Sequence, residues 1–416
     1  MSFNKSKLAM AVAALTFSSG AFATNGIIQA GNGMVAHGFG GAGLSNAGEA
    51  AAGMDNPALI SQTGDALSIG WSIFMPDRTV DSTGAVGAAG TVDTSDSKTF
   101  SIPQIAFTSK IDDKMSWGIM AYALGGMNTD YRTGLVPSSP ANPATGQAAG
   151  NVAQSVNLQG MIVAPTFSYA FSKDFTAGAS LIIGYETLTT RNLFGLNPSG
   201  TNEGSATGFG VKLGADWKLN DGISVGAMLQ PKLSMEEITY FKTFLGGFGF
   251  TGDAALTLPA EAGLGAKFAV GKDVDIVADI LYYQWSGVDV FKFFGWDDQI
   301  VYKVGAEFRT SDKLALRVGF NYGESPIKGG NRTENGSMDA AFANYPFPAI
   351  SETHFTLGLG YKMDKNMTFN AYYLYSPETS QTATGSSMTP GGPFPAGTKI
   401  SMSQNAFGLG INYAVK

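Results

Sequence analysis

The sequence predicts an all-β fold: a transmembrane antiparallel up-and-down β-barrel of about 14 strands with an N-terminal hatch in its lumen. Three observations lead to this prediction. The chain begins with an export signal, the segments after residue 63 alternate apolar and polar residues, and short turns alternate with long loops. The 55 glycines, 28 phenylalanines and 15 tyrosines also suit many strands and turns better than helices.

Residues 1–23 have the features of a secretory signal peptide. Lys5 and Lys7 precede the apolar run 8–17, and Ala21-Phe22-Ala23 is a small-x-small cleavage site. The signal contains two lysines and no acid, so its removal takes the formal net charge from −7 to −9. Such an acidic chain does not favour nucleic-acid binding. The chain has no cysteine, so its stability does not depend on disulfides, and a closed sheet in a membrane can supply stability instead.

Alternation of period two marks the strands. It is clearest where Leu314, Leu316, Val318, Phe320 and Tyr322 are apolar and the residues between them are small or polar. A soluble sandwich or barrel is the alternative, with its apolar face turned inward. The membrane barrel is favoured because the strands have roughly the 9 to 11 residues that a tilted membrane strand needs. The alternate face also carries glycine and full charges, and aromatic residues lie at the strand ends.

The connections between the strands fall into two length classes. Six short turns lie at 112–113, 172–174, 220–222, 271–273, 310–312 and 364–366, and seven long loops lie near 77–98, 128–157, 190–204, 238–252, 286–298, 326–352 and 378–399. Their alternation gives the strand number and places both termini on the short-turn side, which is periplasmic in bacterial barrels. Residues 24–62 are rich in glycine and alanine and do not alternate, so we expect them to fill the lumen as a hatch, with residues 63–416 forming the barrel.

A resemblance to a known family begins in this hatch. Residues 38–61, GFGGAGLSNAGEAAAGMDNPALIS, resemble the N-terminal hatch of the FadL-type outer-membrane transporters for long-chain fatty acids and other hydrophobic compounds, including an Asn-Pro-Ala signature at Asn56, Pro57 and Ala58. Later segments such as YKVGAEFRTSDKLALRVGFNYGESPI are similar to later strands of that family in order and spacing. The resemblance implies capture of a hydrophobic ligand at extracellular loops. It also implies release through hatch rearrangement and a lateral opening in the wall.

Two long loops carry more aromatic side chains than loops facing water normally expose. We expect a ligand-binding surface made of Phe241, Lys242, Phe244, Leu245, Phe248, Phe250, Phe291, Lys292, Phe293, Phe294 and Trp296. Aromatic surface with lysines suits a ligand that has a hydrocarbon body and an anionic end, because a charge-assisted hydrogen bond to a carboxylate is stronger than a neutral one. The alternative is that the rings pack on each other or on lipopolysaccharide.

Charged residues on the polar face of the strands are expected to face the lumen. Lys303, Arg309 and Arg317 belong to this set, paired in part with Glu307, Asp216, Asp275 and Asp279, and one or two of the basic groups at most would anchor a ligand head group. Gly125 and Gly126 lie in the third predicted strand, where a glycine pair marks a bulge or a break in strand pairing. They are therefore a candidate lateral gate.

Catalysis, metal binding and cofactor binding find no support in the sequence. Residues 38–43 match G-x-G-x-x-G, but the strand and helix that flank a dinucleotide site are missing. His37 and His354 have no second His or Cys at ligand spacing, so each is expected to be structural. We therefore predict no enzyme activity, no cofactor and no metal.

The sequence leaves three functions open. The leading one is passive uptake of hydrophobic molecules, either fatty acids or aromatic and aliphatic hydrocarbons, across the bacterial outer membrane by a monomeric barrel in contact with membrane lipid and lipopolysaccharide. A structural or adhesive barrel with a fixed plug is the principal alternative, in which the loops carry the function. A general hydrophilic porin is the third, and the hatch weighs against it.

Overall fold

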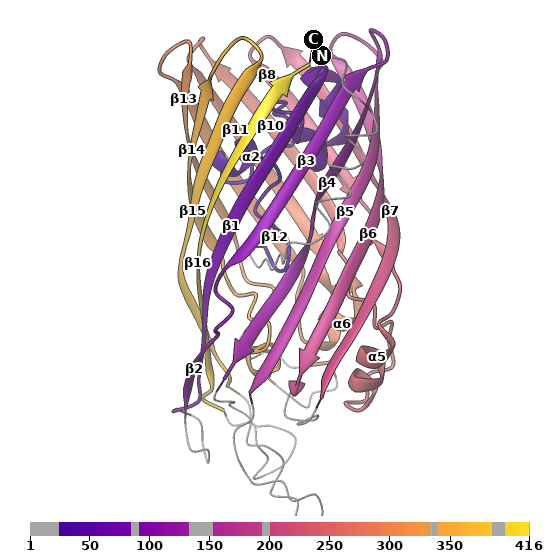
Figure 1. The fold of residues 1–416 in the computed structure, drawn as a ribbon, viewed down its shortest axis with the longest axis vertical. Coiled ribbons are helices and arrows are strands. Elements are labelled where there is room, and N and C mark those ends of the chain that lie inside the picture. Colours follow the sequence, from indigo (N-terminus) through magenta and orange to yellow (C-terminus); the bar gives the residue numbers. More distant parts are fainter. Residues whose placement is uncertain are drawn as a thin grey trace, which may run out of the picture.

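The protein folds as one antiparallel sheet that closes on itself. The structure is a computed structural model that describes residues 25–84, 91–132, 153–193, 200–328, 330, 333–334, 339–384 and 396–415. The predicted signal peptide, residues 1–23, lies outside the described residues. Strand β16 pairs with β1 as well as with β15, and this last pairing closes the sheet into the barrel of Figure 1.

Fourteen long strands form the wall within the described residues, and each pairs with its neighbours along the chain. They are β1 (Ala66–Asp81), β3 (Phe100–Lys110), β4 (Met115–Tyr131), β5 (Gln154–Ala170), β6 (Phe175–Arg191), β7 (Thr201–Asn220), β8 (Ile223–Gln230), β10 (Ala260–Val270), β11 (Val274–Gln284), β12 (Gln299–Arg309), β13 (Leu314–Gly323), β14 (Thr353–Lys362), β15 (Met367–Thr382) and β16 (Lys399–Ala414). Two short strands, β2 (Val92–Thr94) and β9 (Ser234–Met235), pair with β1 and β7. The predicted up-and-down barrel of about 14 strands is confirmed.

The six short turns connect neighbouring strands at the predicted positions, for example between Lys110 and Met115 and between Arg309 and Leu314. Strand β1 begins and β16 ends at the same end of the barrel as these turns (Figure 1). The long loops lie at the opposite end and contain α5 (Thr239–Gly246), η3 (Trp285–Gly287), α6 (Asp289–Phe293) and α7 (Ala340–Ala343). The two ends of the barrel therefore differ in loop length and in helix content.

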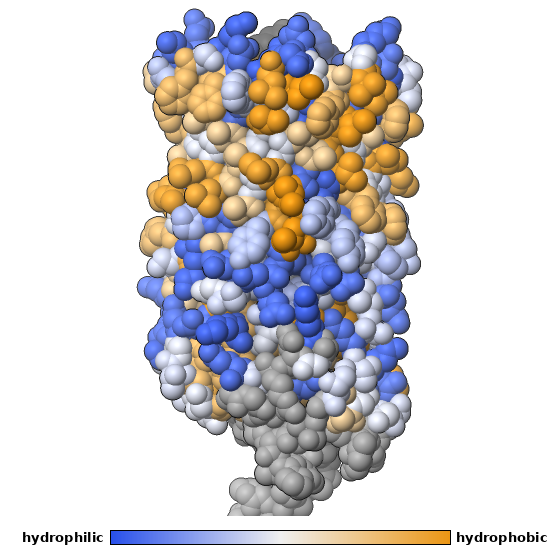
Figure 2. Space-filling view, turned by 180° about the vertical axis from the view of Figure 1, so that it is seen from behind, coloured by the Kyte–Doolittle hydropathy of each residue, from blue (hydrophilic) through white to orange (hydrophobic). Residues whose placement is uncertain are grey.

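The wall has its apolar face outside. Leu316, Val318 and Phe320 are 41%, 44% and 37% exposed, whereas Arg317 and Asn321 between and beside them are 6% and 0% exposed. Figure 2 shows hydrophobic side chains gathered in the half of the barrel nearer the short turns, with hydrophilic residues over the half nearer the long loops. This inversion suits a wall that faces lipid, and it excludes the soluble sandwich or barrel considered above. No helix in the described ranges is long and apolar enough to cross a membrane.

The lumen is filled by the N-terminal segment. We use "hatch" for residues 25–62, the described part of the predicted segment 24–62. It contains four short helices, α2 (Met34–Gly38), α3 (Ala52–Asp55), η1 (Pro57–Leu59) and α4 (Ile60–Thr63), the last of which ends one residue beyond it. Most hatch side chains are buried against the wall. The hatch can pack this closely because the wall offers glycine at the contact points: a Cβ at Gly226 would lie 1.9 Å from the carbonyl oxygen of Leu44.

Candidate functional site

The Asn-Pro-Ala signature anchors the hatch to the wall. Asn56 is fully buried, and its Nδ2 donates to the carbonyl oxygens of Leu44 in the hatch, at 2.6 Å, and of Ala215 in β7, at 3.0 Å. Its Oδ1 accepts from the Ala58 amide at 3.1 Å, which caps η1, and Pro57 occupies the first turn of that helix, where a missing N–H costs nothing. One amide side chain therefore fixes the local turn and its attachment to the barrel.

Charged side chains of the wall hold the hatch backbone at two further points. Asp279 Oδ2 accepts from the amides of Gly43, at 2.7 Å, and Leu44, at 3.1 Å. Lys212 Nζ donates to the carbonyl oxygen of Met54 at 3.0 Å. Because these groups are buried and charged, each such hydrogen bond is stronger than one between neutral groups. The hatch is thus fastened along residues 43–56.

The predicted lumenal charges divide into two kinds. Arg309 is paired with Asp275 at 2.9 Å and with Glu307 at 2.9 Å, and Arg317 pairs with the same Glu307 at 2.7 Å. This network matches the predicted pairing with wall acids and occupies both guanidinium groups. Lys303 is buried and forms no ion pair within 4 Å among the described residues. It lines a cavity between the hatch and the wall.

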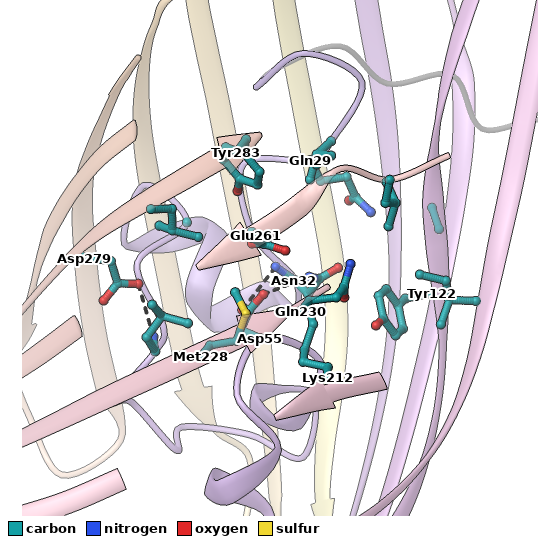
Figure 3. Close-up of a pocket in the computed structure, with 18 of the residues that line it drawn as sticks. Gln29, Asn32, Asp55, Tyr122, Lys212, Met228, Gln230, Glu261, Asp279 and Tyr283 are labelled. Atoms are coloured by element: carbon teal, nitrogen blue, oxygen red, sulfur yellow. Dashed lines mark hydrogen bonds between the residues drawn. The ribbon is translucent and has the colours of Figure 1, made fainter. Parts of the chain in front are cut away.

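That cavity is small and is lined by both polar and apolar residues. Figure 3 shows Asn32 and Asp55 of the hatch together near Lys212 and Glu261 of the wall. Asn32 and Asp55 both line the cavity, and Asn32 Nδ2 donates to Asp55 Oδ1 at 2.8 Å. The volume of about 40 Å³ is enough for roughly two or three water molecules. This cavity therefore suits hydration of buried charges.

The two predicted aromatic loops converge at the long-loop end. The rings of Phe250 and Phe293 meet at 5.1 Å between centroids, and Phe241, Phe291 and Phe294 line one apolar pocket between the loops. We call it the loop pocket; its other lining residues are Met127, Val156, Leu188, Thr190, Leu193, Leu256, Val290 and Phe347. The predicted residues Leu245 and Trp296 are buried in the same apolar cluster, and Phe244 and Phe248 are half-buried against it.

The two lysines of the predicted surface do not line the loop pocket. Lys242 pairs with Glu237 at 2.6 Å and Lys292 pairs with Glu334 at 2.9 Å. Both lysine side chains are about half exposed. The structure therefore brings the predicted aromatic residues together and leaves the predicted cations on the outer surface of the same loops.

The wall has a gap in its hydrogen bonding beside Gly125 and Gly126. Strand β3 pairs with β1 as far as Phe100, but it pairs with β4 only between Ile105↔Ala121 and Lys110↔Ser116. On the other side of β4, the register with β5 shifts between Ala123 and Gly125, which is a β-bulge. Beyond the gap the wall is joined again, because the amide of Asp96 donates to the carbonyl oxygen of Asp130 at 2.8 Å. We call this gap the wall window.

The beginning of the hatch occupies the wall window. The Gly126 amide donates to the carbonyl oxygen of Ile27 at 3.3 Å. Gly125 has φ +149°, and a Cβ there would lie 2.7 Å from the same oxygen. Glycine is required at this position both for its backbone conformation and for the close approach of the hatch.

Gly26, the hatch residue before Ile27, contacts the tryptophan that precedes the second aromatic loop. Gly26 lies against the indole of Trp285, where a Cβ would come within 2.3 Å of Cζ2. The Trp285 ring in turn meets Phe291 at 5.1 Å and Trp296 at 5.0 Å between centroids. Sequence reasoning did not single out Ile27 or Trp285. The sequence feature that could have indicated Trp285 as a site residue is its position directly before the aromatic loop, at the end of a predicted strand.

Metal and histidine chemistry receive no support from this geometry. No group of three or more His, Asp or Glu side chains that could hold a metal ion occurs in the described ranges. His37 Nδ1 lies 2.7 Å from the carbonyl oxygen of Gly33, and its ring stacks on Tyr372 at 4.3 Å. His354 is fully buried in β14. His37 thus has a packing role within the hatch contacts.

The docked hatch is expected to loosen as the pH rises. Glu49 is buried in the hatch and accepts from the Val35 amide at 2.7 Å, and burial raises the pKa of its carboxyl from 4.5 to about 7. A raised acid pKa means that the docked state holds the proton more tightly, so this contribution to its stability is greatest below pH 4.5 and is lost as the pH rises from 4.5 to about 7. Deuterium exchange of the amides in residues 33–38, corrected for intrinsic rates, should therefore be slower at pH 5 than at pH 7.5.

The variant E49Q provides the control for this prediction. Its amide oxygen can still accept from Val35, but it does not titrate. The difference in protection between the two pH values should disappear in E49Q. An equal difference in both proteins would show that another group controls the hatch.

Comparisons with known proteins agree with this geometry. The family model for outer membrane protein transport proteins (OMPP1/FadL/TodX) matches residues 10–415. The structure is similar to the P. putida toluene transporter TodX (TM-score 0.67, 19% identity), a Pseudomonas aeruginosa FadL homologue (0.65, 14%) and the Ralstonia pickettii toluene transporter TbuX (0.63, 18%), each over 93% of this chain and 99% of the other. A comparison with curated proteins gives no match. Because the family model covers nearly the whole chain, the protein belongs to the OMPP1/FadL/TodX family of outer-membrane transport barrels, which are channels and not enzymes.

Proposed function

We propose that this barrel takes up hydrophobic molecules passively: the loop pocket captures the ligand, and the wall window releases it sideways when the first hatch residues move. The observation that carries the proposal is the position of Gly26 and Ile27. Gly26 contacts Trp285 of the aromatic cluster, and Ile27 contacts Gly126 at the window. A ligand that displaces the aromatic rings would therefore disturb the residues that fill the window.

The loop pocket supports an apolar substrate. Its lining is aromatic and aliphatic apart from Thr190, and its free volume is about 10 Å³, so a ligand enters by displacing the aromatic rings. Two of the similar structures are toluene transporters, which is consistent with aromatic hydrocarbons as ligands here; long-chain fatty acids are the other class. In this proposal Lys242 and Lys292 act at the outer rim, where their charge attracts an anionic end before the hydrocarbon enters.

The orientation follows from the two ends of the barrel. We propose that the short turns and both chain ends face the periplasm and that the long loops face outward, since bacterial barrels have short periplasmic turns and longer extracellular loops. The hydrophilic half of the wall then lies on the outer side, in contact with lipopolysaccharide (Figure 2). We propose a monomer as the working unit, because pocket, window and hatch belong to a single chain.

Replacing Phe241 by Ala is expected to reduce the initial rate of uptake of labelled toluene or palmitate about tenfold. Phe241 is 3% exposed and forms one wall of the loop pocket. Loss of a buried aromatic contact costs a ligand on the order of 1.5 kcal/mol, which corresponds to roughly a tenfold change. Uptake is measured in intact cells at a ligand concentration below saturation.

Phe209→Ala is the matched control, because Phe209 is 59% exposed on the lipid-facing side of β7. It should leave the uptake rate unchanged. Normal uptake by F241A, with the barrel correctly inserted, would count against capture in the loop pocket. Absence of uptake by the native protein would instead favour the adhesive barrel, whose loops bind a surface and whose plug stays closed.

A further inference from the structure

Glu186 is a buried acid without a partner in the lumen. It lies in β6 at a position that faces inward, and it is 0% exposed. Neither of its carboxyl oxygens has a hydrogen-bond partner among the described residues, and it takes part in none of the ion pairs found there. Most other inward-facing acids discussed above are used in pairs or in hatch contacts, so Glu186 stands apart.

The neighbours of Glu186 are small or apolar. In the register of the strands, Glu186 lies opposite Gly160 in β5 and Ala206 in β7. Gly160 in turn lies opposite Gly125 in β4, so these four residues form one row across the wall. Two residues closer to the short turns, Gly184 faces Leu124, Leu233 and Met235. A Cβ at Gly184 would lie 3.1 to 3.2 Å from side-chain atoms of these three residues.

The position of Glu186 relates it to the proposed ligand path. Two and four residues further along β6, Leu188 and Thr190 line the loop pocket. Leu124 of β4 and Ile162 of β5, on the neighbouring strands, line the small cavity between the hatch and the wall. Gly125, in the same row as Glu186, forms the edge of the wall window. A ligand that moves from the loop pocket to the window therefore passes the carboxyl group.

A buried carboxyl without a hydrogen bond destabilises a fold, by roughly 1 to 3 kcal/mol and more when charged. A ligand that donates a hydrogen bond removes this cost. Both protonation states of a carboxyl group contain a free acceptor oxygen, so an O–H or N–H donor suits either state. A ligand carboxylate, by contrast, meets repulsion when Glu186 is ionised.

We propose that Glu186 is a polar subsite on the ligand path and accepts a hydrogen bond from a hydroxyl or amino group on an otherwise hydrophobic ligand. The inference rests on the proposed uptake function and narrows its substrate class. It favours molecules such as alkylphenols over alkylbenzenes of the same size, and when Glu186 is ionised it disfavours the matching aromatic carboxylates. The apolar neighbours of Glu186 contact the hydrocarbon part of the ligand, and the carboxyl group accepts the hydrogen bond from its hydroxyl or amino group.

The test compares three ligands of one shape: 4-propylphenol, propylbenzene and 4-propylbenzoate. Their dissociation constants are measured by calorimetry on the full-length barrel in detergent, for the native protein and for E186L and E186Q. E186L should weaken binding of 4-propylphenol about tenfold and leave propylbenzene within about twofold. E186Q should keep most of the affinity for 4-propylphenol, since its amide oxygen still accepts. At a pH at which Glu186 is ionised, binding of 4-propylbenzoate should strengthen in both variants.

The control is E203Q, the same change at an acid that is exposed on the adjacent strand β7. It should alter none of the three affinities. Folding is checked by the heat-dependent shift of the barrel on a gel, and E186M replaces E186L if the latter does not fold. Equal changes for all three ligands in E186L, or native binding of 4-propylphenol that is weaker than that of propylbenzene, would overturn the subsite. Absence of binding for all three to the native protein would instead overturn the proposed uptake of such molecules.

Discussion

Deleting Leu124 is expected to lower the uptake of a hydrophobic ligand at least tenfold while the barrel stays folded. Leu124 is the extra residue in β4, since Ala123 pairs with Met161 and Gly125 pairs with Gly160. Without it the two strands can pair without a bulge, and β4 is no longer bent away from β3. Residues 100–104 of β3, which pair with β1 but have no partner in β4, then gain one, and the wall window closes.

The measurement is uptake of labelled toluene or palmitate by cells that carry equal amounts of inserted barrel. Deletion of Leu219 is the matched control: the register of β7 and β8 shifts between Lys218 and Asn220, far from the window, so this deletion also removes a bulge. It should leave uptake unchanged. Full uptake by the Leu124 deletion would mean that the ligand leaves by another route, such as past the hatch into the periplasm.

Replacing Gly226 by Ala is expected to displace the hatch from the wall and to make the barrel permeable to ions. The new Cβ would lie 1.9 Å from the carbonyl oxygen of Leu44, which also accepts from Asn56 at 2.6 Å. A backbone atom held in this way cannot shift as a side chain can, so the hatch must move as a unit. Conductance of single barrels in a planar bilayer should rise at least tenfold, and added protease should cut the hatch.

Gly222→Ala in the neighbouring turn is the control, because a Cβ there meets its nearest atoms at 3.5 Å, an ordinary contact. Its conductance should stay at the native level. If G226A also remains closed and resists protease, the contact between Leu44 and β8 is not what seats the hatch. A porin-like steady conductance of the native protein would equally contradict a closed hatch.

The barrel was predictable because its signal is local. Alternation around Arg317 and its apolar neighbours shows which face meets lipid, and turn sequences show where each strand ends. The glycine pair at Gly125 and Gly126 indicated an irregular strand for the same reason, since the cause lies in the residues themselves. These features depend on a few neighbouring positions and on period two.

The site was less predictable because it is made of distant contacts. Nothing near Ile27 in the sequence indicates that it meets Gly126, and nothing near Trp285 indicates that it meets Gly26. Lys242 stands among phenylalanines along the chain, yet the helix α5 turns it toward Glu237. The direction of a side chain on a short loop helix depends on packing, and alternation gives no information about it.

The uneven attachment of the hatch has a consequence for permeability. Residues 43–56 are fixed by buried hydrogen bonds to Asp279, Lys212 and β7, whereas Ile27 meets the wall at the longer distance of 3.3 Å. Segments with weaker attachment open locally at lower free energy than the rest of a fold. In the proposed release, the first hatch residues would leave the window while the remainder still blocks the lumen. Hydrophobic molecules would then reach the membrane without admission of water, salts or hydrophilic solutes.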